Sequence, residues 1–161
     1  MSETTFTDSR NRVWHLTVTI GDAMRLKREL GFDTGKLLEE GNSEFQKLIQ
    51  DEWLIVQILV VLLGPQLQSR KMLTDSGDGD GSKKPTDSFY DGLVGETLDD
   101  ATAAFLHAVA DSLPKSKRRA MKAMLTKLSA TIETAATAMD RKIESMDLTE
   151  KITTTINQIE I

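Results

Sequence analysis

The segment that decides the fold is a long apolar run in the middle of the chain. Residues 53–63 read Trp53-Leu54-Ile55-Val56-Gln57-Ile58-Leu59-Val60-Val61-Leu62-Leu63. Such a run is apolar nearly all round a helix, yet it is far shorter than the ~20 residues that span a bilayer. We therefore predict a buried core helix and no membrane contact. Ser43 and Gln46 form a capping-box pattern, so this helix is predicted to begin at residue 43 and to end or kink at Gly64-Pro65.

Composition favours a single, mainly α-helical domain. The chain has 161 residues, of which 39% are hydrophobic and 28% charged, with only three prolines and 5% aromatic residues. This is enough apolar material for one core, and it is poor in the residues of turn-rich β-sandwiches. We predict a helical domain over residues 1–146, with a short N-terminal β-hairpin and a long amphipathic C-terminal helix, followed by an amphipathic tail over residues 147–161.

The N-terminal hairpin is predicted within residues 1–20. Residues 13–20 alternate so that Trp14, Leu16, Val18 and Ile20 share one face of a strand, and residues 8–11 supply turn formers after a short β-prone run. A lone hairpin is marginal in water, so this face should lie on helices. Asp22 is then expected to cap a helix that ends at Gly31.

A polar stretch over residues 74–87 is predicted to be a mobile loop, because it lacks the apolar side chains that would order it. Its residues Ser76, Asp78, Asp80, Gly81 and Asp87 have spacings like those of a calcium-binding loop. However, serine replaces the first carboxylate and aspartate replaces the bidentate glutamate, so a solvated linker is the better interpretation. Beyond it, Thr97 and Asp100 are expected to open a helix that closes before Pro114.

The C-terminal part carries a stripe with alternating spacings of four and three, broken only at Lys142: Met121, Leu125, Leu128, Ile132, Ala135, Met139 and Met146. This heptad pattern either packs inside the protein or binds a second copy or an apolar client helix. We take the second interpretation and predict that partner contacts include Met121, Leu125, Leu128, Ile132 and Met139. Methionine suits an adaptable surface because its side chain is flexible and polarisable.

Basic residues crowd the start of the same helix, where the helix dipole disfavours cations: Lys115, Lys117, Arg118, Arg119, Lys122 and Lys127. Lys117, Arg118 and Arg119 are therefore candidate contacts for an acidic partner, with a solvated face as the alternative. Nucleic acid is an unlikely partner, because the net charge is −5 and no aromatic residues are interleaved for base stacking.

Catalytic chemistry has little support in this sequence. There is no cysteine, and the two histidines, His15 and His107, are far apart in the chain. The glycines at 77, 79 and 81 lie among aspartates and lack the lysine of a phosphate-binding loop. We predict no catalytic, cofactor or metal site and no enzyme activity. The polar, acidic start at Met1-Ser2-Glu3 lacks the features of a leader, which suggests the cytoplasm.

The N-terminal residues Phe6-Thr7-Asp8-Ser9-Arg10-Asn11-Arg12-Val13-Trp14-His15-Leu16, followed by a helix ending Leu30-Gly31-Phe32-Asp33, carry a family resemblance. With the apolar helix near Trp53 and the segment Phe105-Leu106-His107-Ala108-Val109 before Leu113-Pro114, the chain resembles tail assembly chaperones of phages and prophages. The resemblance covers about two thirds of the chain and implies a protein that shields the long apolar helices of a tape-measure protein in the host cytoplasm until tail subunits polymerise.

The expected function is therefore non-catalytic protein binding, with a tape-measure-like or other tail protein as partner and with self-association into a homo-oligomer as a further expectation. Two other interpretations stay open. The chain could be a structural or connector component of the virion, or a small regulatory protein that uses the basic cluster at residues 115–127.

Overall fold

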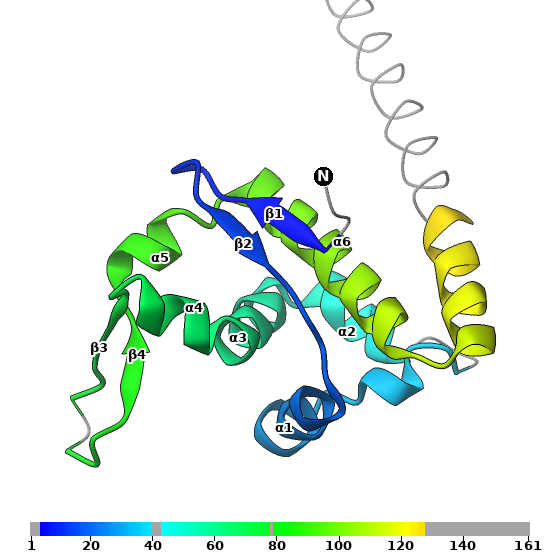
Figure 1. The fold of residues 1–161 in the computed structure, drawn as a ribbon, viewed down its shortest axis with the longest axis horizontal. Coiled ribbons are helices and arrows are strands. Elements are labelled where there is room, and N and C mark those ends of the chain that lie inside the picture. The colour runs from blue at the N-terminus through cyan, green and yellow to red at the C-terminus, as the bar shows by residue number, and fades with distance from the viewer. Residues whose placement is uncertain (1–3, 40–42, 78, 128–161) are drawn as a thin grey trace, which may run out of the picture. The chain divides into compact units, whose positions relative to one another are not determined.

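The computed structural model describes residues 4–39, 43–77 and 79–127. In this part of the chain the fold is mainly α-helical with a short N-terminal β-hairpin, as predicted (Figure 1). The chain divides into two compact units, residues 1–122 and 123–161. The second unit is described only over the helical residues 123–127, so the long C-terminal helix and the tail over 147–161 lie largely or wholly outside the described residues.

The N-terminal hairpin pairs β1 (Thr5–Thr7) with β2 (Val13–His15) in antiparallel register, with Phe6 opposite Trp14. Asp8 organises the turn, because its carboxylate accepts from the backbone N–H groups of Arg10 and Arg12 at 2.9 and 3.0 Å. The predicted face continues past the strand, since Leu16 and Val18 are also buried. Ile20 is instead 80% exposed, and its predicted place on that face is wrong.

The reason is that Thr19 ends the extended segment and caps helix α1 (Ile20–Leu30). The Thr19 hydroxyl accepts from the Asp22 N–H, and the Asp22 carboxylate accepts from the Thr19 N–H, so the two form a capping box. Asp22 is therefore the third helical residue and not the cap that we predicted. Gly31 closes the helix in the left-handed conformation (φ 66°), as expected, and a short 3₁₀ turn, η1 (Thr34–Lys36), follows.

The predicted helix over residues 43–63 is two helices, α2 (Ser43–Gln50) and α3 (Glu52–Leu62). Asp51 separates them, because its backbone is extended and its carboxylate accepts from the Trp53 N–H at 3.0 Å, which starts a new helix. Gly64 and Pro65 open a further short helix, α4 (Gly64–Ser69), so the predicted interruption there is confirmed.

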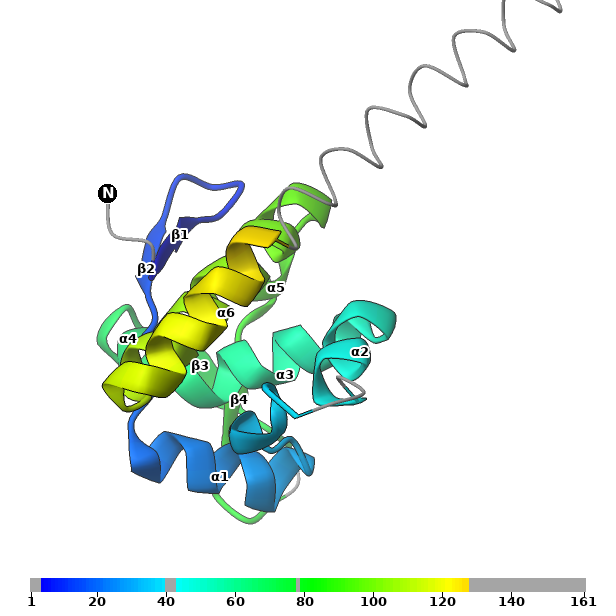
Figure 2. The same ribbon diagram turned by 90° about the vertical axis from the view of Figure 1, so that its right-hand side faces the viewer.

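Helix α3 is central, with α1 against one side and α6 (Gly95–Ser112) against another (Figures 1 and 2). It buries Leu54, Ile55, Ile58 and Leu59. Trp53, at its start, is 71% exposed. The prediction that the whole run is buried is therefore wrong on one face of α3.

The structure differs from two further expectations between α4 and α6. The stretch predicted as a mobile loop contains a second hairpin, β3 (Leu73–Asp75) with β4 (Lys83–Pro85), which extends away from the helices in Figure 1. An ion pair between Lys83 Nζ and Asp75 Oδ1 (2.6 Å) links its strands, and burial of Pro85 anchors its base. After α5 (Asp87–Asp91), α6 begins at Gly95, so Thr97 is buried inside the helix and is not its cap.

Side chains of α4 cover the open edge of β2. The Gln66 side chain accepts from the His15 N–H at 3.1 Å and donates to the His15 carbonyl at 2.7 Å, while Arg70 donates to the Val13 carbonyl. The Arg70 guanidinium also lies 4.2 Å from the centre of the Trp14 ring. Within the described ranges, no helix combines the length and apolar character needed to cross a membrane.

Candidate protein-binding groove

Of the stripe predicted on the last helix, only Met121 and Leu125 lie within the described residues. Met121 is fully buried, so its side chain offers nothing to a partner in this structure. Leu125 belongs to the second unit, while Leu128, Ile132 and Met139 lie outside the described residues. The proposed contact surface along this stripe therefore stays a prediction, and Met121 is buried in this structure.

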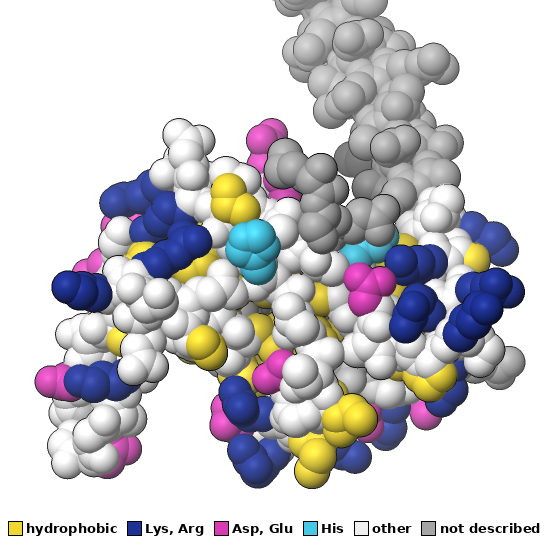
Figure 3. Space-filling view, viewed as in Figure 1, with side chains coloured by type: hydrophobic (Ala, Val, Ile, Leu, Met, Phe, Trp, Pro, Cys, Tyr) yellow, Lys and Arg dark blue, Asp and Glu magenta, His cyan; other side chains and the backbone are white. Residues whose placement is uncertain are grey.

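The basic cluster has a local structural explanation. Arg118 donates to the backbone carbonyls of Asp111 and Leu113 at 3.2 and 3.3 Å, and Lys122 pairs with the Asp111 carboxylate at 3.1 Å. These cations stabilise the C-terminal end of α6, where carbonyl groups lack helical partners. Lys117 and Arg119 are exposed and form no ion pair with any described residue; Lys and Arg side chains gather over this segment in Figure 3.

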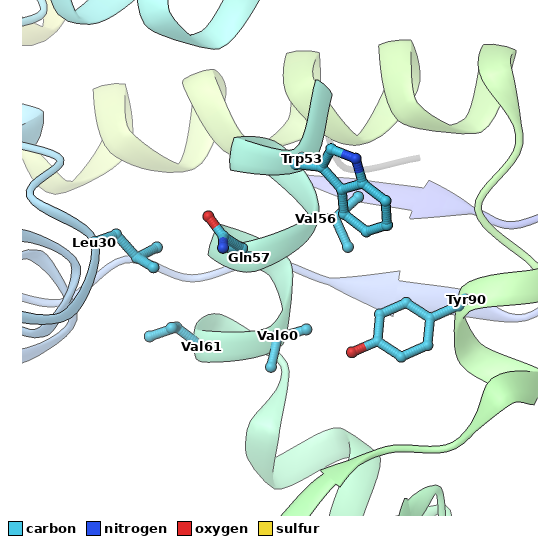
Figure 4. A pocket seen from close by; sticks show the side chains of 7 residues that line it. All are labelled: Leu30, Trp53, Val56, Gln57, Val60, Val61 and Tyr90. Atoms are coloured by element: carbon cyan, nitrogen blue, oxygen red, sulfur yellow. The ribbon is translucent and has the colours of Figure 1, made fainter. Parts of the chain in front are cut away.

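The structure reveals an apolar groove along the outer face of α3, which sequence reasoning assigned to the core (Figure 4). It encloses about 460 Å³ and is lined by Leu30 of α1, Tyr90 of α5 and five residues of α3: Trp53, Val56, Gln57, Val60 and Val61. A hollow of about 240 Å³ shares Trp53, Val56 and Tyr90 and adds Glu52, Leu93 and Leu98. Together the two form a continuous apolar surface in the first unit.

The groove exists because α3 has more apolar surface than its neighbours cover. Residues 54, 55, 58 and 59 pack inward, which leaves Trp53, Gln57 and Val60 at spacings of four and three along the other face. Trp53 is 71% exposed and Tyr90 is 37% exposed. Large aromatic side chains beside an open groove are typical of protein-binding surfaces.

The groove and the adjoining hollow contain three polar side chains, Gln57, Glu52 and Tyr90. Gln57 is a neutral amide, and Glu52 lines the adjoining hollow together with Tyr90. Burial raises the pKa of Tyr90, and the Asp87 carboxylate raises it further. The phenol therefore stays protonated near neutral pH and acts as a hydrogen-bond donor at the rim.

The most buried carboxylate, Asp8, is occupied by the fold. Its Oδ2 accepts from Trp14 Nε1 at 2.9 Å and from Arg12 Nε at 2.7 Å, while its Oδ1 accepts from two backbone N–H groups. Burial alone would raise the pKa of Asp8, but the hydrogen bonds from Trp14, Arg12 and Arg10 outweigh it and hold the pKa below the ordinary value. A carboxylate with all its acceptor positions used has a structural role.

Arg12 carries this network to α5. Its guanidinium donates to the Ser88 carbonyl at 2.7 Å and to the Ser88 hydroxyl at 3.1 Å. The ring of Phe89 meets the Trp14 ring edge-on at 5.4 Å. Gly92 lies so close that a Cβ atom there would fall 2.6 Å from the Arg12 guanidinium. We call Asp8, Arg12, Trp14, Ser88 and Gly92 the Asp8 cluster.

Glu44 is a second buried carboxylate with structural partners. It accepts from the Asp33 N–H at 3.0 Å and from Lys47 Nζ at 2.7 Å. Burial would raise the pKa of Glu44, yet these bonds lower it overall. Like Asp8, it ties two segments together.

Within the described ranges, no group of three histidine, aspartate or glutamate side chains lies close enough together to hold a metal ion. The two histidines are separate from one another in Figure 3.

In comparisons with known proteins, no family model matches this chain, and no curated protein or solved structure matches it.

Proposed function

We propose that this chain is a non-catalytic protein-binding protein that holds an apolar helix of another protein in the groove along α3. The client class suggested by the sequence resemblance is a tape-measure-like tail protein, and the function is that of a phage-type tail assembly chaperone. The observation that carries the proposal is the exposed Trp53 at the rim of a groove whose lining is mostly apolar, with the Gln57 amide and the Tyr90 hydroxyl as its polar groups.

The dimensions of the groove support a helix as the occupant. Its α3 wall runs from Trp53 to Val61, a distance of about 12 Å at 1.5 Å of rise per helical residue. An amphipathic helix can lay two to three turns of its apolar face along such a wall. Because α1 and α5 supply the flanking walls through Leu30 and Tyr90, the occupant is contacted from three sides.

The proposal is tested with a fluorescein-labelled, uncharged peptide of about 20 residues that has leucines along one helical face, its binding followed by fluorescence anisotropy. Trp53→Glu should weaken binding about 30-fold or more, because an exposed aromatic anchor at a groove commonly dominates the binding energy. Met24→Glu is the matched control, since Met24 is 66% exposed, equally apolar and outside the groove lining. It should change the Kd by no more than about twofold.

Tryptophan emission locates the bound peptide. The chain has two tryptophans; Trp14 is fully buried, whereas Trp53 is exposed. A peptide in the groove should shift the emission to shorter wavelength, and Trp53→Phe should abolish that shift. In parallel, co-expression should keep an apolar helical segment of a phage tape-measure protein in solution. No peptide binding, or equal loss of binding in both glutamate variants, would contradict the proposal.

A further inference from the structure

Gln57 is a polar side chain on an otherwise apolar groove wall. It is exposed on α3, and Figure 4 shows it between Leu30 on one side and Trp53 and Tyr90 on the other. Its carboxamide forms no hydrogen bond with any residue in the described ranges. Any occupant that fills the groove must therefore cover a free amide group with one donor and one acceptor end.

A wholly apolar helix fits the groove but matches this group less well than a helix with a polar side chain there. It would remove water from the Gln57 amide without replacing the lost hydrogen bonds, and an unpaired buried amide costs free energy. A second carboxamide is the best complement, because its separate N–H₂ and C=O ends can pair with both ends of the Gln57 amide, whereas a hydroxyl group donates and accepts through a single oxygen atom. A site built around a hydrogen-bonding group rejects analogues that lack the partner group.

A charge at one end of the groove adds a second requirement. Glu52 lines the adjoining hollow, is exposed, and forms no ion pair with any other described residue. It precedes Gln57 by five residues, about 7.5 Å along the helix axis. A cationic side chain four residues from the carboxamide, on the same face of a helix lying along α3, is long enough to extend to this carboxylate.

We propose that the groove selects apolar helices that carry one asparagine or glutamine within the apolar face and a lysine or arginine one turn away on the same face. The selection rests on the proposed function, because it names the chemistry of the helix that the groove holds. The Gln57 amide forms hydrogen bonds with the carboxamide of the bound helix. The Glu52 carboxylate pairs with its cation and so determines which end of the bound helix lies over the start of α3.

A double-mutant cycle tests the carboxamide. Two labelled peptides differ only at the central position of the apolar face, leucine or asparagine, and each is titrated against the full chain and against Gln57→Leu. The ratio of the two Kd values should change about tenfold between the proteins, with the asparagine peptide favoured by the wild type and the leucine peptide favoured by Gln57→Leu. Because Gln57 is exposed, this substitution should leave the unfolding midpoint unchanged, which circular dichroism verifies.

The charge is tested with the asparagine peptide carrying either lysine or glutamine four residues from the asparagine, on the same helix face. Glu52→Gln should weaken the lysine peptide about threefold at low salt and leave the glutamine peptide unchanged. A Kd ratio that is the same in wild type and Gln57→Leu would overturn this inference while leaving the proposed function intact. If neither peptide binds the wild type, the proposed function and this inference both fail.

Discussion

The two tryptophans mark two regions that use the same side chain in opposite ways. Trp14 is fully buried, its ring packs on Phe89, and its N–H bonds to the Asp8 carboxylate. Trp53 is 71% exposed beside an open groove. The difference lies in the partners: the Asp8 cluster satisfies every polar atom that it buries, whereas the groove leaves apolar surface and one amide uncovered. The first region stabilises the fold, and the second is available for binding.

The largest effect should follow from Asp8→Ala. This change removes the acceptor for the Trp14 N–H, the Arg12 side chain and two backbone N–H groups, and it leaves a mostly buried guanidinium without its counter-ion. Breaking one partner out of such a buried pair costs about 3–5 kcal/mol. Urea denaturation followed by circular dichroism measures the loss of unfolding free energy.

Trp53→Ala is the control for Asp8→Ala, because it changes the exposed groove and leaves the Asp8 cluster intact. Surface substitutions away from buried features usually change stability by about 0.5 kcal/mol or less, so its unfolding midpoint should lie close to that of the wild type. A loss below about 1 kcal/mol for Asp8→Ala, or a larger loss for Trp53→Ala, would contradict the division of roles.

An intermediate effect is expected from Gly92→Ala. The added Cβ would lie 2.6 Å from the Arg12 guanidinium and 2.9 Å from the Asp8 carboxylate, so the cluster must shift. Overpacking of this kind costs about 1–3 kcal/mol. Gly95→Ala is the matched control, because a Cβ added at Gly95 would have open space within 4 Å and alanine favours the helix there. It should be neutral or stabilising in the same thermal unfolding experiment, and equal losses in both variants would show that the Arg12 contact is not the cause.

The smallest effect is a dependence of stability on pH. The pKa values of Asp8 and Glu44 lie below their ordinary values of 3.8 and 4.5 in the folded chain, despite the opposing effect of burial. Both carboxylates therefore contribute stability above about pH 4.5, and that stability is lost as the pH falls through the folded pKa values. Unfolding free energy measured from pH 6 to pH 3 should fall, and Asp8→Asn should make the fall shallower. If Asp8→Asn retains the full dependence of unfolding free energy on pH, then Asp8 is not its source.

The features that could be predicted from the sequence are those set by residues close together in the chain. The hairpin turn at Asp8, the helix stop at Gly31 and the interruption at Gly64-Pro65 are local signals, and they were predicted correctly. The break at Asp51 was missed because the apolar pattern continues across it, although an aspartate two residues before the apolar run is itself a capping signal.

The groove was missed for a different reason. Periodicity shows that a helix is apolar on all sides, but not which side its neighbours cover, since that depends on where α1 and α5 lie. Gln57 was the signal in the sequence that indicated the groove. A single polar residue among ten apolar ones marks the helix face that stays exposed to solvent. The second hairpin was missed because backbone pairing and one ion pair order a segment that composition alone describes as a loop.

The covering of β2 by α4 has a consequence for how the molecule can associate. An open strand edge presents free N–H and C=O groups that recruit strands from other chains, which leads to domain exchange or fibre growth. Here the amide of Gln66 occupies both backbone groups of His15, and Arg70 occupies the carbonyl of Val13. The edge of β2 therefore cannot pair with a strand from another chain, even at high protein concentration. Gln66→Ala would reopen that route, and a rise in thioflavin-positive material on storage would reveal it.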